Sequence, residues 1–273
     1  MLLLSVIWNP SPEIFHIGGF AVRWYGLFFA LSFFLGYLIM QKFFTKEGVP
    51  IPLLDELTTY MIVGTIVGAR LGHVFFYEPA WYLSHPIKIL EVWEGGLASH
   101  GAAVGIILSV LVFGHVRKKP FLWIMDRVVI TVALAGFMIR MGNLMNSEIY
   151  GLPTNLPWGF RFLRSSVLSD GLLPRHPTQI YEALSYLAIF FFLWWYYYKK
   201  DGKPAQGMIF GIFMVLVFGV RFLIEFIKEP QVGFEREMVL NMGQILSIPL
   251  IIAGGILIFL ALRKTSRSEP RLR

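Results

Sequence analysis

The feature that most constrains this chain is a series of seven long apolar stretches. Each holds about 20 mostly hydrophobic residues, the length that an α-helix needs to cross the hydrocarbon core of a bilayer. Only helices and closed barrels satisfy their backbone polar groups in lipid, so we predict an all-α fold. We expect a polytopic membrane helix bundle with seven transmembrane helices, forming a single integral membrane domain over residues 1–273. The stretches lie at 20–40, 57–77, 97–116, 122–141, 180–198, 207–226 and 240–262.

The composition excludes a water-soluble globule. Of the 273 residues, 56% are hydrophobic and 15% are charged, whereas a soluble domain is typically about 45–50% apolar and about 25% charged. The chain has no cysteine, which excludes disulfides, thiolate metal sites and a thiol nucleophile of its own. The six histidines show no spacing typical of metal ligands, so we expect no metal and no cofactor.

The charge distribution indicates both a partner and an orientation. The net charge of +7 favours an anionic partner, either lipid head groups or an anionic substrate. Nucleic acid is not expected, because Lys and Arg are not gathered into one long soluble patch. Thirteen basic residues lie in the loops and tail of one side and six in the loops of the other. By the positive-inside rule, the C-terminus is cytoplasmic and the N-terminus faces outside.

Two segments outside the apolar stretches carry structural expectations. Residues 142–179 form the longest connection, and ordered loops above roughly 12–15 residues are usually functional or mobile. We predict a small outer subdomain or lid there, against the alternative of a loosely structured connection. Met1–Trp8 is apolar but short and lacks a basic start, so we expect an interfacial arm rather than a signal peptide. Within the second apolar stretch, Gly64, Gly68 and Gly72 predict a seam of close helix packing.

Arginines recur where lipid should not tolerate them. A charge at mid-membrane costs at least about 2.5–3.5 kcal/mol on insertion scales, so it is normally paired, reaches the interface or is functional. Arg23 and Arg127 are near predicted span ends, and for them we expect snorkelling or a local salt bridge, with Asp126 beside Arg127. Arg70 stays open between structure and function. Five arginines lie within or at the edge of spans: Arg23, Arg70, Arg127, Arg140 and Arg221.

Arg140 opens the densest polar string in the chain. Arg140 and Asn143 share a helix face at i,i+3, and Asn146 and Glu148 follow. Helix capping explains one of these amides but hardly all four polar residues. We therefore favour a functional site at this end of the fourth span.

Arg221 lies deep in the sixth apolar stretch, with Glu225 at i+4 on the same helix face. A structural ion pair is one reading. The alternative is a phosphate ligand, because a guanidinium forks onto phosphate and one carboxylate could hold it in aim.

Three further positions are weaker candidates. His100 stands among small residues and could act as a general base, since histidine titrates near neutrality, although a helix-contact residue is the commoner role. Tyr25 reads as an interfacial aromatic or a hydrogen-bond donor. Thr178 could cap the fifth span, but Glu182, which enters the membrane, is not explained by capping.

Six ordered segments together resemble the bacterial prolipoprotein diacylglyceryl transferases over nearly the whole chain. The string that begins at Arg140 is the specific signature of that family. The chain departs at Ile139, where the family usually has Gly, and at Lys228, where it often has Arg. The matching segments are VRWYG at 22–26, GLASHG at 96–101, RMGNLMNSEIYG at 140–151, HPTQIYEA at 176–183, RFLIEF at 221–226 and MGQILS at 242–247.

The resemblance implies a multi-pass enzyme of the bacterial inner membrane. Such an enzyme moves the diacylglyceryl group of phosphatidylglycerol to the lipobox cysteine of a preprolipoprotein, forming a thioether and releasing glycerol phosphate. A monomer is expected. The resemblance makes His100, Arg140 and Arg221 the candidate catalytic residues. The candidate substrate-binding residues are Tyr25, Asn143, Asn146, Glu148, Gly151 and Glu225.

The residues allow a mechanism for this chemistry. Arg140 and Arg221 would hold the phosphate and its growing charge, and Glu148 and Glu225 would orient the arginines or bind glycerol hydroxyls. His100 would take the thiol proton, with arginine-assisted deprotonation as the rival. Two other classes remain as alternatives: a transporter with a polar midplane site, which seven spans without an inverted repeat do not favour, and a scaffold protein.

Overall fold

The computed structural model describes residues 5–165, 173–230, 235 and 238–268, and in this part of the chain it forms a polytopic helical bundle. A long helix lies in each of the seven apolar stretches. These helices are α1 (Trp24–Lys46), α2 (Ile51–Phe76), α4 (Ser99–Val116), α5 (Phe121–Met145), α6 (Thr178–Lys199), α7 (Met208–Ile224) and α8 (Met242–Ser268).

Not all of these helices are equally apolar. Among the described residues, six helices are long and hydrophobic enough to cross a membrane, and α6 is outside that set. Its first turns carry Gln179 and Glu182, and its last turn is a run of tyrosines. Helical spans are thus confirmed, while the exact count of seven stays a prediction.

Two helix starts differ from the expected boundaries. The first span does not begin at residue 20, because β3 (Phe20–Arg23) pairs antiparallel with β2 (Glu13–Ile17) and α1 starts only afterwards. Helix α2 begins six residues earlier than its apolar stretch, with Pro at the first turn. Proline suits that position because its missing N–H would be unpaired there anyway.

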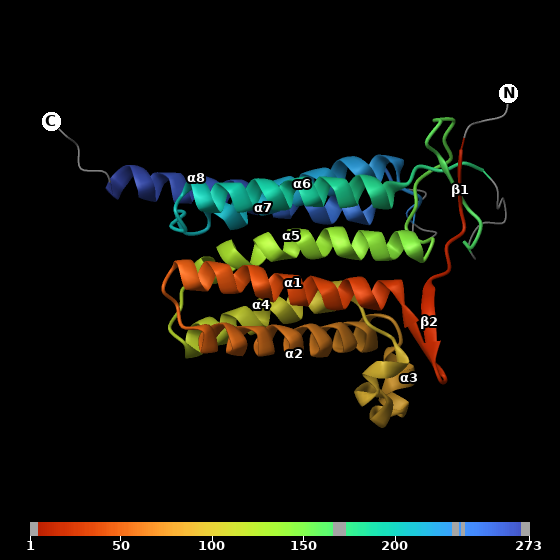
Figure 1. Cartoon of the computed structure of the whole chain (residues 1–273), viewed down its shortest axis with the longest axis horizontal. Helices are drawn as coiled ribbons and strands as arrows, with labels where there is room; N and C mark the ends of the chain where they lie inside the picture. The colour runs from red at the N-terminus through yellow and green to blue at the C-terminus, as the bar shows by residue number, and fades with distance from the viewer. Residues whose placement is uncertain (1–4, 166–172, 231–234, 236–237, 269–273) are drawn as a thin grey trace. The chain divides into compact units, whose positions relative to one another are not determined.

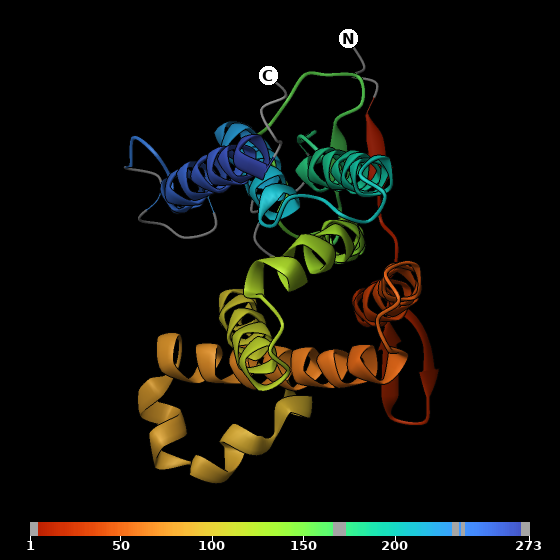
Figure 2. The ribbon, with the colours of Figure 1, turned by 90° about the vertical axis from the view of Figure 1, so that its left-hand side faces the viewer.

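The chain divides into two compact units, Met1–Ile39 with Asp126–Arg273, and Met40–Met125. In the second unit, α2 packs along α4 (Figures 1 and 2). A methyl group at Gly68 or Gly72 would overlap the backbone of Gly101, and one at Gly64 would overlap Ser109. The predicted glycine seam is therefore confirmed as the contact between these two helices.

Arg70, whose role was open, is a structural residue of the second unit. Its side chain is buried and donates to main-chain carbonyls of the segment between α2 and α4. Nε is 2.9 Å from the Ile89 oxygen, Nη1 is 2.6 Å from the Gly95 oxygen, and Nη2 donates to Lys88. That segment contains three short helices (Figure 2), namely α3 (Pro79–Ser84) and the 3₁₀ helices η1 (Pro86–Leu90) and η2 (Val92–Glu94). One guanidinium thus fastens an irregular loop to a spanning helix.

In the first unit, α6, α7 and α8 run side by side (Figures 1 and 2). Asp126 of α5, expected beside a span end, is fully buried and accepts N–H bonds from Gly207 at 2.7 Å and Phe210 at 2.9 Å. It caps the start of α7, since the first N–H groups of a helix have no partner within the helix. Arg127 is also buried, approaches the Gly202 carbonyl and interacts electrostatically with Asp126. Of the two expected arrangements, the structure therefore favours the local pairing over snorkelling. Arg23 does form the expected local salt bridge, with Glu13 at 3.3 Å.

The segment between α5 and α6 folds around a small apolar core. Strand β4 (Phe160–Phe162) pairs in parallel with β1 (Val6–Trp8). The indole of Trp8 donates to the Leu144 carbonyl at 2.8 Å, which ties the N-terminal arm to the end of α5. Leu144, Tyr150, Phe160 and Phe162 form the core. Residues 1–4 of the expected arm and 166–172 of the connection lie outside the described residues.

Candidate functional site

The C-terminal end of α5 and the N-terminal end of α6 bring Arg140 and Glu182 together. Arg140 Nε is 2.8 Å from Glu182 Oε2, and its Nη2 donates to Glu182 Oε1 at 3.1 Å. The Glu182 side chain is fully buried and that of Arg140 is 12% exposed. Arg140 also donates to the phenol oxygen of Tyr186, one turn further along α6. Removing one partner of such a pair leaves an uncompensated buried charge, so the pair holds Arg140 firmly.

Asn143 links Arg140 to Glu148 by hydrogen bonds. Arg140 Nη1 donates to Asn143 Oδ1 at 3.2 Å, which confirms the predicted i,i+3 relation. The Asn143 amide nitrogen in turn donates to Glu148 Oε1 at 2.8 Å, and Asn146 donates to the same oxygen at 3.2 Å. Both amides therefore serve Glu148, and neither is a simple helix cap.

Glu148 lies in a strained turn. Its neighbours Ser147 and Ile149 have φ angles of 54° and 59°. Such left-handed angles are rare for residues other than glycine, above all for a β-branched residue. Strain of this kind persists only where the surroundings enforce it, and it concentrates at functional sites.

The first residues of α6 hold this strained turn in place by hydrogen bonds. The buried Gln179 donates to the Glu148 carbonyl at 2.7 Å, and Thr178 donates to the Ile149 carbonyl at 3.0 Å. The expected capping role of Thr178 is wrong, because the N-cap of α6 is Pro177 and its cap has no side-chain hydrogen bond. The hydroxyl of Thr178 instead holds the strained turn in place.

The third part of the site is the C-terminal end of α7, where Arg221, Glu225 and Lys228 lie. Arg221 is in the last turn of α7, so its expected position deep in the span is wrong. The predicted i,i+4 pairing with Glu225 is present, with Arg221 Nε 3.7 Å from Glu225 Oε1. The Arg221 side chain is 38% exposed, in contrast to that of Arg140. Arg221 is therefore the more open of the two guanidinium groups.

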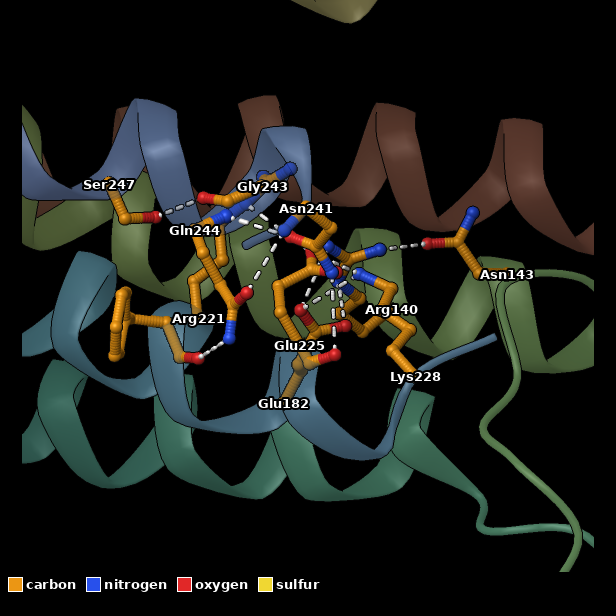
Figure 3. A network of polar contacts seen from close by, with 11 residues as sticks. Arg140, Asn143, Glu182, Arg221, Glu225, Lys228, Asn241, Gly243, Gln244 and Ser247 are labelled. Atoms are coloured by element: carbon orange, nitrogen blue, oxygen red, sulfur yellow. Dashed lines mark hydrogen bonds and ion pairs between the residues drawn. The ribbon is translucent and has the colours of Figure 1, made fainter. Parts of the chain in front are cut away.

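Lys228 joins the two acidic groups of the site (Figure 3). Its Nζ donates to Glu225 Oε1 at 3.0 Å and is 3.5 Å from Glu182 Oε1. Lys228 directly follows the spanning segment, and burial lowers the pKa of its ammonium against the opposing influence of Glu182 and Glu225. The contacts thus form one connected network, here called the polar cluster. Its members are Arg140, Asn143, Glu148, Glu182, Arg221, Glu225 and Lys228.

Tyr25 and Gly151 lie beside the polar cluster in the same unit. A Cβ at Gly142 would be 2.8 Å from a ring carbon of Tyr25, so the tyrosine lies against the helix turn that carries Arg140 and Asn143. At Gly151 a Cβ would be 2.5 Å from the Ile227 carbonyl oxygen, and the backbone of Gly151 bridges to Lys228. Gly151 thus permits a close backbone approach that sets the position of Lys228.

His100 lies in the other unit. It is exposed in the first turn of α4, and its ring stacks on Tyr77 at 5.8 Å and meets Phe76 edge-on at 5.6 Å. It also lines an apolar groove between α2 and α4 together with Gly72 and Gly101. Its assignment as a base stays a prediction.

Sequence reasoning left three members of this site out. Glu182 and Lys228 were noticed as unexplained or variant positions, but their partners are 42 and 46 residues away along the chain. Tyr186 gave no signal of its own. The one available clue was an acidic residue inside a span, which by itself indicates a buried partner.

The arrangement suits an anionic ligand held by guanidinium groups. Arg140 binds Glu182 through both Nε and Nη2. The side chain of Arg221 is more exposed, and its Nε is 3.7 Å from Glu225 Oε1. A guanidinium offers five N–H donors in a fixed fork that matches phosphate. Within the part of the chain that the structure describes, no three His, Asp or Glu side chains gather as a metal site would require.

Comparison with known proteins gives a consistent result. A family model described as prolipoprotein diacylglyceryl transferase matches residues 12–260. Three relatives carry the name phosphatidylglycerol–prolipoprotein diacylglyceryl transferase. They come from Tolumonas auensis (46% identical, 96% of this chain and 100% of the relative), Chloroherpeton thalassium (45%, 95% and 95%) and Porphyromonas gingivalis (46%, 94% and 95%).

Proposed function

The chain belongs to the prolipoprotein diacylglyceryl transferase family, and we propose that the polar cluster is where it binds and activates phosphatidylglycerol. The protein is a transferase of lipoprotein biosynthesis. It moves the diacylglyceryl group of phosphatidylglycerol to the lipobox cysteine of a preprolipoprotein, the first step of lipoprotein maturation. The observation that carries our assignment is the connected cluster of three cations and three carboxylates at the end of α5, the start of α6 and the end of α7.

The chemical step needs a stabilised leaving group. The cysteine sulfur forms a bond to the terminal glyceryl carbon, the bond from that carbon to the phosphate ester oxygen breaks, and the electron pair leaves with glycerol phosphate. Arg221 supplies the forked contact to the phosphate, because its side chain is 38% exposed and its ion pair with Glu225 is loose, at 3.7 Å. Arg140 adds the N–H donors that Glu182, Asn143 and Tyr186 leave unused. Fixed donors in a site of low dielectric constant stabilise such developing charge strongly.

The carboxylates Glu182 and Glu225 orient the cations of the cluster. Glu182 fixes Arg140 through two contacts, and Glu225 restrains Arg221 and Lys228. Glu148 is held by two amides rather than by an arginine. We assign Glu148 to binding of the glycerol head group, because its second oxygen can accept hydrogen bonds from the glycerol hydroxyls. Tyr25 donates to the same head group or to the phosphate.

The acceptor thiol must lose its proton. A free cysteine has a pKa of about 8.5, so little thiolate exists at neutral pH. His100 accepts this proton in our assignment, and arginine-assisted deprotonation is the rival. The nucleophile arrives on the peptide substrate, since the chain itself has no cysteine.

The protein is a multi-pass inner-membrane protein. We further propose that its N-terminus faces outside and its C-terminus the cytoplasm, that residues 142–179 form an outer subdomain, and that the protein is a monomer. The excess of basic residues in one set of loops supports the orientation. The core of Leu144, Tyr150, Phe160 and Phe162 supports the subdomain.

A reconstituted reaction tests the assignment. The purified protein is mixed with phosphatidylglycerol vesicles and a lipobox peptide, and the peptide mass is followed. A mass increase equal to one diacylglyceryl group is expected, together with release of glycerol phosphate. A peptide in which Ser replaces the lipobox Cys is the matched control. Lipidation that persists fully in an Arg140→Ala, Arg221→Ala double variant would contradict the role of the polar cluster.

A further inference from the structure

The first turn of α8 holds Glu225 in place from two sides. Asn241, directly before the helix, donates from Nδ2 to Glu225 Oε2 at 3.1 Å. Gly243 lies against the same carboxylate, since a Cβ there would be 2.5 Å from both Cδ and Oε1 of Glu225 (Figure 3). Neither residue belongs to the polar cluster, yet both determine where its Glu225 can be.

Asn241 divides its side chain between two tasks. Its Oδ1 accepts the Gln244 N–H at 2.9 Å, while Gln244 Oε1 accepts the Asn241 N–H at 3.0 Å. This is the reciprocal pattern of a capping box, which satisfies unpaired N–H groups at a helix start. The oxygen of Asn241 thus caps α8, and only its amide nitrogen reaches Glu225.

The two oxygens of Glu225 have different partners. Oε1 accepts a hydrogen bond from Lys228 Nζ at 3.0 Å and is 3.7 Å from Arg221 Nε. Oε2 accepts a hydrogen bond from Asn241 Nδ2. The Asn241 bond therefore fixes the rotation of the carboxylate so that Oε1 is turned towards the two cations. Gly243 completes this arrangement, because it leaves room for the carboxylate where any side chain would displace it.

We propose that Asn241 and Gly243 are positioning residues for Glu225 and, through it, for Arg221. This proposal rests on the proposed function of the polar cluster. It makes the start of α8 part of the phosphate-binding apparatus, although neither residue contacts the substrate.

Two substitutions separate positioning from helix stability. Asn241→Asp keeps the capping oxygen, and Asp is as good an N-cap as Asn, but it replaces the donor to Glu225 by a charged acceptor. Gly243→Ala adds a methyl group that favours the helix and pushes the Glu225 carboxylate aside. Ser247→Ala is the matched control one turn further along α8, where the hydroxyl donates to the Gly243 carbonyl at 2.6 Å.

The readouts are kcat/KM for phosphatidylglycerol in the vesicle assay and the thermal unfolding temperature. We expect Asn241→Asp and Gly243→Ala each to lower kcat/KM by about ten-fold or more, the loss typical of one hydrogen bond to a charged group. The unfolding temperature should stay within a few degrees of wild type, and Ser247→Ala should keep its activity.

Distinct outcomes overturn distinct claims. Wild-type activity in both Asn241→Asp and Gly243→Ala would overturn the positioning role and leave the proposed function standing. Activity that falls only in proportion to a lowered unfolding temperature would reduce both residues to helix stability and also overturn it. A wild-type protein that fails to lipidate the peptide would instead overturn the proposed function.

Discussion

Arg70 and Arg140 are both arginines inside spanning helices, but their surroundings differ in kind. Arg70, in the second unit, is buried against main-chain carbonyls of the loop that follows its helix. Arg140, in the first unit, is bound to the side chains of Glu182 and Asn143, which belong to a larger network. One arginine stabilises a loop, whereas the other belongs to a cluster of matched charges.

The difference shows how to separate structural from functional charge in a membrane protein. Carbonyls balance a guanidinium by hydrogen bonding and leave no reason for further ionisable groups nearby. Around Arg140 the chain instead gathers two more cations and three carboxylates, each of which is costly to place in a membrane. In our assignment, these groups bind and orient a charged ligand.

The largest effect is expected from Arg140→Ala. The variant removes the phosphate donor of our assignment and leaves Glu182 with Lys228 as its cationic partner. Turnover should fall by about 1,000-fold, the upper range for loss of one preorganised donor. The peptide lipidation rate measures this, with Arg70→Lys as the control. Near-normal turnover in Arg140→Ala would erase the distinction between the two arginines.

Arg221→Ala should cost about 100-fold in kcat/KM for phosphatidylglycerol, since in our assignment Arg221 makes the forked contact to the phosphate. Its unfolding temperature should hardly change, because a 3.7 Å ion pair of a side chain that is 38% exposed contributes little stability. Arg221→Lys should recover part of the loss by charge alone. A stability loss without an activity loss would make Arg221 a second structural arginine, like Arg70.

His100→Gln tests whether the second unit contributes to chemistry at all. Loss of a general base typically costs about 100-fold or more. The defect should shrink as pH rises towards the pKa of the thiol, about 8.5, because the thiolate then forms without a base. Rates measured from neutral to alkaline pH check this, with Phe76→Leu as a neighbouring control. A defect that is the same at every pH would exclude the base role.

Arg70→Ala should have the smallest effect on turnover and a clear effect on stability. It leaves several loop carbonyls unpaired, at a cost of about 1–3 kcal/mol for each such group that stays buried. We expect a lower unfolding temperature, while the folded fraction keeps its lipidation rate within about three-fold. A loss as deep as that of Arg140→Ala, at full stability, would show that carbonyl-bound arginines also act in catalysis.

The sequence predicted those contacts that follow from helix spacing. Arg140 with Asn143 and Arg221 with Glu225 are three and four residues apart, so one helix places them together. The pair of Arg140 with Glu182 depends on how two helices pack, which no local pattern reveals. The partners of Arg70 are main-chain carbonyls, and those carry no signal in a sequence.

The same limit explains the errors in the fold. The apolar pattern located every long helix, but it placed the first start within β3 and missed the polar first turns of α2. Arg127 was expected either to snorkel or to form a local salt bridge, because its distance from a span end and the neighbouring Asp126 were visible. The turn before α7, which buries its side chain, was not visible in the sequence. Tertiary packing decides these cases.

The most direct test of the central claim is an experimental structure of the protein with bound phosphatidylglycerol. The account predicts phosphate oxygens about 2.7–3.2 Å from the terminal nitrogens of Arg221 and from an N–H of Arg140. Glu182 should still hold Arg140, and Glu225 should still face Arg221. A phosphate bound elsewhere, with both arginines contacting only their carboxylates, would contradict it.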